Sequence, residues 1–263
     1  MVTLFQMIGA SFVLVQLLMF ILWGIYTRQR NTAIVDVGWA VGFILTMVAY
    51  FFLGYGSFWK TLLLLLMVVL WASRLAFYLF DRLINNVEDP RYAELRKRWG
   101  DSNGDVKVLV LFVFQGVLVT VLTLPFLLVA CCPNPIWTGW EIFGALLWAV
   151  GLAGETYADE NLRQYKAAQT GEVCKKGLWY YSRHPNYFFE WIIWLGFAFY
   201  ALSSTAGILA FISPALMYYI LRYISVPLTE AHLLQSKGEN YKQYQETTNE
   251  FFPWFPAKKA DSP

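Results

Sequence analysis

Long runs of apolar residues alternate with short polar segments along most of this chain of 263 residues. Each run approaches the roughly 20 residues that an α-helix needs to cross the hydrocarbon core of a bilayer. The pattern therefore predicts an all-α integral membrane protein, a bundle of transmembrane helices joined by short loops. The seven predicted spans are Leu4–Tyr26, Thr32–Phe52, Phe58–Phe80, Val106–Cys131, Ile142–Tyr157, Asn186–Leu202 and Ala206–Tyr223.

Lysine and arginine residues are distributed unevenly over the loops between these spans. One set of loops is rich in them, including residues 82–107 and 163–183, whereas the other set holds little more than Lys60. Cytoplasmic loops carry the excess of positive charge in membrane proteins. We therefore expect an external N-terminus, a cytoplasmic C-terminus and an odd number of spans.

The composition supports a lipid environment and excludes several classes of function. Hydrophobic residues make up 58% of the chain and charged residues 14%, against about 25% charged residues in a typical soluble domain. A formal net charge of +2 without a long basic tract argues against a nucleic-acid partner. Cys131, Cys132 and Cys174 form no disulfide framework, and His184 and His232 stand far from any cysteine pair, so no metal site is predicted.

Ionisable residues within predicted spans are functional candidates, because a charge at the bilayer centre costs roughly 2.5–3.5 kcal/mol on insertion scales. Asp36 lies in the second span, and Arg74 lies in the third with Trp71 and Tyr78 on the same helix face. Asp36 and Arg74 both fall toward the cytoplasmic ends of their spans. They could form an interhelical salt bridge, the arginine could extend to the interface, or both could serve a reaction.

The fifth span continues into a polar extension. Glu155, Asp159 and Arg163 follow one another at i,i+4 steps on one helix face, with Asn161 and Lys166 nearby. A solvated helix face would show the same pattern, so this segment alone does not predict a site.

The densest group of polar and aromatic residues is the segment 177–191. Pro185 favours the first turn of a helix, which places Arg183 in the preceding loop and Asn186 and Glu190 on one face of the sixth span. A helix N-terminus offers unpaired N–H groups to an anion, and an arginine beside it can bind a phosphate with two hydrogen bonds. This segment therefore predicts a ligand pocket, and Arg222 at the end of the seventh span adds a further cation. Residues after Pro227 are too polar to span again and either cap this pocket or lie on the membrane surface.

Several motifs resemble those of the steroid 5α-reductase superfamily. The segment Asp159–Trp194, with Arg183-His184-Pro185-Asn186-Tyr187, is similar to the C-terminal cofactor domain of that superfamily. The resemblance extends over nearly the whole chain and is strongest to an uncharacterised bacterial branch, DUF1295, which implies a location in a bacterial inner membrane. The motifs similar to this branch are Asp36-Val37-Gly38-Trp39, Trp71-Ala72-Ser73-Arg74-Leu75, Glu88-Asp89-Pro90-Arg91-Tyr92 and Phe252-Pro253-Trp254.

The resemblance implies an enzyme that uses NADPH to reduce an activated carbon–carbon double bond in a steroid or lipid-like enone, such as a Δ4-3-oxosteroid. Residues 1–263 would form one membrane domain, with residues 1–131 on the substrate side and 142–263 on the cofactor side. Asn186 and Glu190 would contact the nicotinamide. The full set of implied cofactor-binding residues is Asp159, Asn161, Arg163, Lys166, Tyr181, Arg183, His184, Asn186, Tyr187, Glu190, Trp194, Arg222 and Glu230.

The substrate end departs from the eukaryotic members of the superfamily. Those members polarise the substrate carbonyl with a Gln-Glu pair on the second helix and a tyrosine on the third. No Gln-Glu pair stands in the second span here. Asp36 lies near the glutamate position and Tyr78 is the phenol in reach, so Asp36, Arg74 and Tyr78 are the expected catalytic residues.

Two alternative functions stay open. The Arg-His-Pro-Asn-Tyr segment, with Glu230 and the pair Tyr241 and Tyr244, also resembles membrane methyltransferases that bind S-adenosylmethionine and act on isoprenylcysteine or phospholipid. The cations Arg163, Lys166, Arg183 and Arg222 favour the phosphate-rich NADPH over that ligand. A lipid or sterol carrier is the third interpretation. We expect a monomer whose partners are its hydrophobic substrate and membrane lipid.

Overall fold

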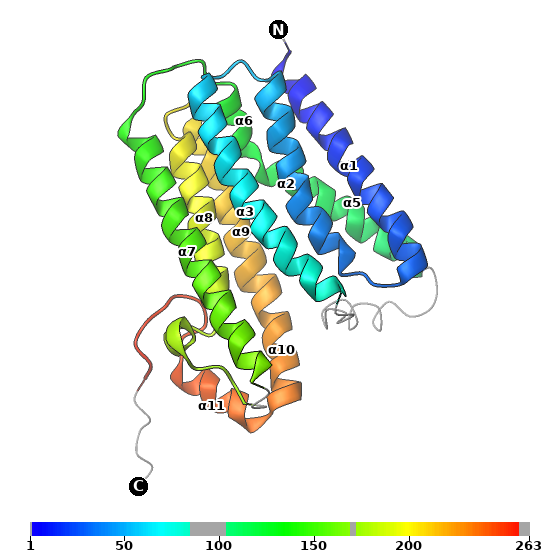
Figure 1. The fold of residues 1–263 in the computed structure, drawn as a ribbon, viewed down its shortest axis with the longest axis vertical. Coiled ribbons are helices and arrows are strands. Elements are labelled where there is room, and N and C mark those ends of the chain that lie inside the picture. The colour runs from blue at the N-terminus through cyan, green and yellow to red at the C-terminus, as the bar shows by residue number, and fades with distance from the viewer. Residues whose placement is uncertain (1, 85–103, 169–171, 258–263) are drawn as a thin grey trace. The chain divides into compact units, whose positions relative to one another are not determined.

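The computed structural model describes residues 2–84, 104–168 and 172–257. Within these ranges all regular structure is helical, as the sequence predicts (Figure 1). The motif at residues 88–92 lies outside the described residues. Five helices are long and apolar enough to cross a membrane, so the chain is a multi-pass membrane protein. These helices are Leu4–Gln29, Ile34–Leu53, Phe58–Ile84, Gly104–Leu122 and the composite helix Gly207–Lys237.

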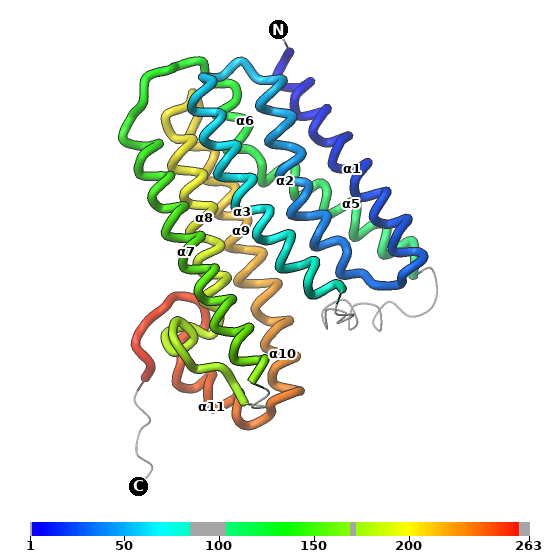
Figure 2. Tube along the Cα trace, viewed as in Figure 1, coloured from blue at the N-terminus to red at the C-terminus, as the bar shows by residue number. Residues whose placement is uncertain are grey.

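The chain folds as two compact units. The first unit holds residues 1–141 and 198–213, and the second holds residues 142–197 and 214–263. Their elements can be followed along the Cα trace in Figure 2. Those of the first part of the chain are α1 (Leu4–Gln29), α2 (Ile34–Leu53), α3 (Phe58–Ile84), α5 (Gly104–Leu122) and α6 (Leu124–Ala130). Those of the later part are α7 (Gly139–Ala167), η1 (Gly177–Tyr180), α8 (Pro185–Ala201), η2 (Gly207–Phe211), α9 (Ile212–Tyr219), η3 (Ile220–Ser225), α10 (Val226–Lys237) and α11 (Glu239–Thr247).

In the first unit α2 is the central helix, because it packs against α1, α3 and α5. The turn between α2 and α3 meets the end of α6 closely. The Gly56 amide donates to the Ala130 carbonyl at 2.7 Å, and a Cβ added at Gly54 would lie 2.4 Å from that carbonyl oxygen. Only glycine fits so near a backbone oxygen, and the two glycines therefore let this turn pack against α6.

The predicted fourth span, Val106–Cys131, is two helices in the structure. The break falls at Thr123, whose hydroxyl donates to the Thr120 carbonyl at 2.8 Å. Pro125 lacks an amide hydrogen and stands in the first turn of α6, where that hydrogen is not needed. The residues on both sides of Thr123 are apolar, so the apolar pattern did not predict the start of α6. Pro125 is the residue in the sequence that marks this start.

A buried ion pair joins the start of α3 to the start of α7 in the first unit. Lys60 is paired with Glu141, and the two side chains are 3% and 0% exposed. Lys60 Nζ also donates to the Ile136 carbonyl at 2.6 Å, while Ser203 Oγ and the Thr138 amide donate to the Glu141 carboxylate at 2.6 and 2.9 Å. Burial raises the pKa of Glu141, which precedes the apolar stretch of α7, but hydrogen bonds from Lys60, Ser203 and Thr138 outweigh burial and lower it to about 2.

In the second unit α7 and α8 approach each other closely at small residues. A Cβ at Gly154 would lie 2.3 Å from the Phe189 ring, and one at Gly196 would lie 2.6 Å from the Trp148 amide nitrogen. Small residues of this kind allow membrane helices to pack at short range. The packing sets the polar residues of the two helices opposite one another.

The last long helix passes Pro227 without ending. Residues Ile220–Ser225 form a π-helical turn, and Pro227 falls in the first turn of α10, the next element. Single π turns inside helices recur at functional sites. This one carries Arg222 and precedes Glu230.

Candidate functional site

Arg183 lies at the centre of a buried polar cluster in the second unit. Its Nε and a terminal nitrogen donate to the two carboxylate oxygens of Glu230 at 2.7 and 3.3 Å. The other terminal nitrogen donates to the carbonyl oxygens of Gln245 and Thr248 at 3.1 and 2.6 Å. The guanidinium therefore joins the loop before α8 to α10 and to the C-terminal segment, residues 239–257, which we call the tail.

Glu230 accepts hydrogen bonds from several further groups. The His184 ring nitrogen lies 3.0 Å from Oε1, and the Tyr241 hydroxyl donates to the same oxygen at 3.2 Å. Gln245 Nε2 donates to Oε2 at 2.6 Å. The carboxylate side chain is 11% exposed, so a nearly buried charge is met by donors from two segments, the loop before α8 and α11.

The C-terminal segment is held by two further sets of contacts. Tyr244 donates its hydroxyl to the Trp179 carbonyl, and the Ser182 hydroxyl donates to the Phe251 carbonyl at 2.9 Å. Burial raises the pKa of the Tyr241 and Tyr244 phenols, so both are neutral donors at physiological pH. The structure thus brings Arg183 and His184 together with Glu230 around the tail.

Arg222 is paired with the same tail. Its terminal nitrogens contact the Glu250 carboxylate at 3.0 and 2.5 Å, and the guanidinium lies 5.5 Å from the Tyr223 ring centroid. Like Arg183, it would have to share or release a carboxylate in order to bind a phosphate.

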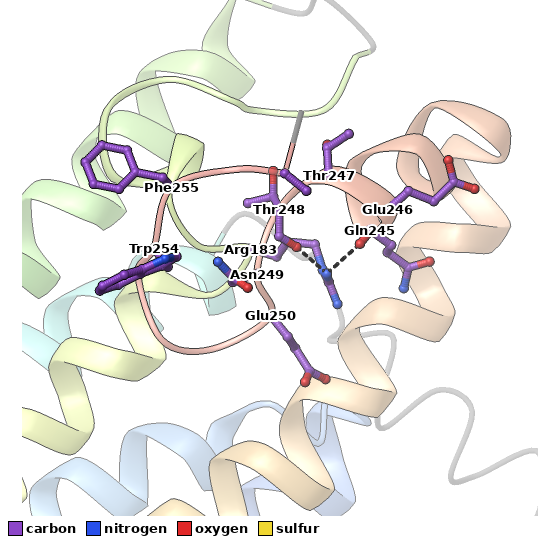
Figure 3. A pocket seen from close by; sticks show the side chains of 10 residues that line it. Arg183, Gln245, Glu246, Thr247, Thr248, Asn249, Glu250, Trp254 and Phe255 are labelled. Atoms are coloured by element: carbon purple, nitrogen blue, oxygen red, sulfur yellow. Dashed lines mark hydrogen bonds between the residues drawn. The ribbon is translucent and has the colours of Figure 1, made fainter. Parts of the chain in front are cut away.

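An open pocket of about 320 Å³ lies beside the buried cluster. Figure 3 shows Arg183 within the loop of residues 245–255, with the rings of Trp254 and Phe255 on one side and Glu246 on the other. Among the described residues, Arg183 is the only member of the predicted cofactor set that lines this pocket. The remaining lining comes from the tail.

The facing surfaces of α7 and α8 form a second polar group. Asn186 Nδ2 donates to Asp159 Oδ1 at 3.2 Å, and Trp194 Nε1 donates to Glu190 Oε1 at 3.0 Å. Asp159, Glu190 and Glu155 are all buried. The Asn186 Oδ1 atom is buried and has no hydrogen-bond partner among the described residues.

The remaining predicted cofactor residues of the second unit are more exposed. Arg163 is 67% exposed and donates two hydrogen bonds of 2.8 Å to Glu160 within its own helix, and Lys166 is exposed as well. Asn161 donates to the Tyr157 carbonyl at 2.9 Å. The i,i+4 face of α7 thus divides into a buried acidic part and an exposed basic part.

Two predicted tyrosines flank these groups. The Tyr187 ring stacks on His184 with centroids 5.4 Å apart, and its hydroxyl lies 3.4 Å from the Thr229 hydroxyl. Tyr181 lies on the surface, and its carbonyl accepts from the Trp254 amide at 2.9 Å.

The predicted catalytic residues Asp36, Arg74 and Tyr78 lie in the first unit, and all three are half-buried. Asp36 stands in the first turn of α2, and the other two stand in the second half of α3. Because α2 and α3 are joined by a short turn and pack together, the three residues lie toward the end of this helix pair that is far from the turn.

Sequence reasoning missed Gln245 and Glu250, which bind Glu230 and Arg222 from the tail. Their partners are 15 and 28 residues away in the chain, and no local motif marks them. The one available signal was the spacing of Tyr241, Tyr244 and Gln245, which places all three on one side of a short helix.

A family model described as "Protein of unknown function (DUF1295)" matches residues 22–248. No curated protein and no solved structure matches the chain. The match confirms the uncharacterised branch that the motifs indicated, while the relation to steroid 5α-reductases stays a prediction. Because the matched region covers most of the 263 residues, the chain belongs to the DUF1295 family.

Proposed function

We propose that this protein is an NADPH-dependent reductase of an activated carbon–carbon double bond in a hydrophobic enone, such as a Δ4-3-oxosteroid. The proposal joins a membrane setting suited to an apolar substrate with a polar group on α7 and α8 suited to a nicotinamide. The motif resemblance points to the same chemistry.

The Asn186 amide is the observation that carries the proposal. Its bond to Asp159 fixes which way the amide points, and no donor in the described part of the chain reaches its buried Oδ1. A buried acceptor in this state costs roughly 1–3 kcal/mol, which a ligand N–H would recover. The carboxamide of a nicotinamide carries such an N–H, so the residues present fit this part of the cofactor.

Other residues of the second unit would complete the cofactor site. Glu190, oriented by Trp194, would accept from the nicotinamide end, and the exposed Arg163 and Lys166 would bind phosphates. NADPH supplies a hydride when bound. The remaining need is a hydrogen-bond donor at the substrate ketone, where negative charge grows during reduction, and we assign this role to Asp36 or Tyr78, with Arg74 as the third catalytic residue.

The membrane arrangement belongs to the same proposal. Helices α7 and α8 add two crossings to those of the five apolar helices, which gives an odd number of spans. The N-terminus then lies outside and the C-terminus in the cytoplasm of a bacterium, where NADPH is available. The protein acts as a monomer.

One observation favours the methyltransferase alternative. Arg183 and Arg222 already form ion pairs, whereas Glu155, Asp159 and Glu190 place three buried carboxyl groups on α7 and α8. Buried carboxylates suit a cationic ligand, and S-adenosylmethionine carries a sulfonium and an ammonium group.

Titration of the purified full-length protein in detergent distinguishes the two. We expect NADPH fluorescence to change at micromolar protein and S-adenosylmethionine to have no effect. Asn186→Ala should abolish the NADPH response, whereas Thr156→Ala should preserve it, because Thr156 is exposed on α7 and its hydroxyl donates to the Leu152 carbonyl of its own helix. Consumption of NADPH with a panel of enones then tests the reaction. Binding of S-adenosylmethionine without any response to NADPH would establish the alternative.

A further inference from the structure

Four aromatic side chains form an exposed cluster on the second unit, here called the aromatic patch: Tyr180, Tyr181, Trp254 and Phe255. Trp254 and Phe255 are 70% and 71% exposed. The rings are continuous, because Tyr180 contacts Tyr181, Tyr181 contacts Phe255 and Phe255 contacts Trp254, with centroids 5.1, 5.7 and 6.3 Å apart. Such a continuous exposed apolar surface marks an interaction site more often than isolated rings do.

The patch is held rigidly from behind. Phe251 is 2% exposed and packs against the rings of Trp191 and Tyr218, with centroids 6.3 and 5.3 Å apart. The Trp254 amide donates to the Tyr181 carbonyl. The tail therefore presents two large rings outward at a fixed position instead of burying them.

Contacts with α7 fix the level of the patch along that helix. In the part of α7 that belongs to the second unit, the exposed large apolar side chains are Ile142, Phe143, Leu146, Val150 and Tyr157. From Ile142 to Tyr157 they cover about 22 Å at 1.5 Å per residue, which is most of a hydrocarbon core of about 30 Å.

The patch adjoins the end of this apolar stripe. Trp179, directly before Tyr180, donates its indole N–H to the Ala158 carbonyl at 2.8 Å, one residue beyond Tyr157. The next turns of α7 expose Arg163 and Lys166, and the loop before the patch exposes Lys175 and Lys176. Tyrosine and tryptophan rings bordered by cations at the end of an apolar stripe have the composition of a membrane interface.

We propose that the aromatic patch sits in the headgroup layer of a bilayer that contains anionic lipid, and thereby anchors the C-terminal segment to the membrane surface. The lipid is the occupant that the position and the neighbouring cations favour over a second copy of the chain or a stacked nucleotide. This inference does not depend on the reductase activity.

Fluorescence quenching in reconstituted protein tests the proposal. In the full chain, the three native cysteines are replaced by serine, and Trp254→Cys is then introduced as the single labelling site. This variant is labelled with a bimane dye and reconstituted into vesicles of equal parts phosphatidylcholine and phosphatidylglycerol. We expect quenching by a phosphatidylcholine spin-labelled near the headgroup and protection from aqueous iodide. Lys242→Cys, exposed on α11, is the matched control and should show the reverse.

A second measurement covers the case in which the cysteine-free chain does not fold. In the otherwise unchanged chain, Trp254→Phe should remove a lipid-quenched component of tryptophan emission. Three outcomes overturn the proposal: iodide quenching at position 254 equal to that at 242, protection that appears only at high protein concentration in detergent, or protection that requires added NADPH. The second of these would assign the patch to a second copy and the third to a nucleotide.

Discussion

Replacement of Glu230 by glutamine separates a structural role of this residue from a ligand-binding one. The NH₂ group of a glutamine would face side chains that themselves donate hydrogen bonds, such as Tyr241 and Gln245. The Arg183 charge would also lose its partner in a site where the carboxylate is only 11% exposed. Removal of one partner from a buried ion pair costs about 3–5 kcal/mol. Because the cluster joins α10 to the tail, we expect the tail to carry this cost. The equilibrium constant for local opening of the tail should rise roughly a hundredfold or more.

Hydrogen exchange followed by mass spectrometry measures this opening directly. Peptides from residues 239–257 should exchange faster in Glu230→Gln, while peptides from α8 serve as the internal reference. Glu239→Gln is the control, since Glu239 is 67% exposed and its carboxylate lies 3.9 Å from Nζ of Lys242, which is 61% exposed. Unchanged exchange in the tail combined with weaker NADPH binding would refute the structural role and make Glu230 a cofactor ligand.

Three further predictions concern the rest of the molecule. Lys60→Met should lower the free energy of unfolding in detergent by about 3–5 kcal/mol, because it leaves the Glu141 charge buried without its partner. The double variant Lys60→Met/Glu141→Gln should recover part of the lost free energy of unfolding. A double variant that is less stable than the single one would contradict this. Since the pKa of Glu141 is lowered from 4.5 to about 2, its stabilisation should be complete above pH 4.5 and be lost as the pH falls toward 2 in acid titrations of unfolding; a flat profile there would contradict the ion pair. Arg163→Ala/Lys166→Ala should weaken NADPH binding a few-fold at low salt and little at high salt, and a salt-independent loss would argue against a phosphate contact.

Most of the helical organisation could be predicted from apolar periodicity. The pattern located α1, α2 and α3 to within a few residues, because a lipid-facing helix must be apolar over a fixed length. It did not show the break at Thr123, since the residues on both sides are equally apolar, nor the continuation of the helix past Pro227. Local composition contains little information about where one helix ends inside an apolar run.

The candidate site was predictable in its members but not in its pairings. Asn186 and Asp159 were both expected at the site, and the structure joins them. Arg183 was expected to bind a phosphate, yet its guanidinium is bonded to groups 47, 62 and 65 residues further along the chain. Such partners are set by tertiary packing, and a motif that ends at Trp194 cannot specify them.

Because of the π-helical turn at Ile220–Ser225, the number of residues in the composite helix Gly207–Lys237, and not only their identity, determines the geometry of the site. A π turn accommodates one residue more than an α-helix does, and each residue rotates the rest of the helix by about 100°. Deleting a single residue there would allow a regular α-helix to form and turn Glu230 away from Arg183 without replacing either side chain. Hydrogen exchange of α11 would then resemble that of Glu230→Gln, so homologous chains that lack the extra residue would need a different partner for this arginine.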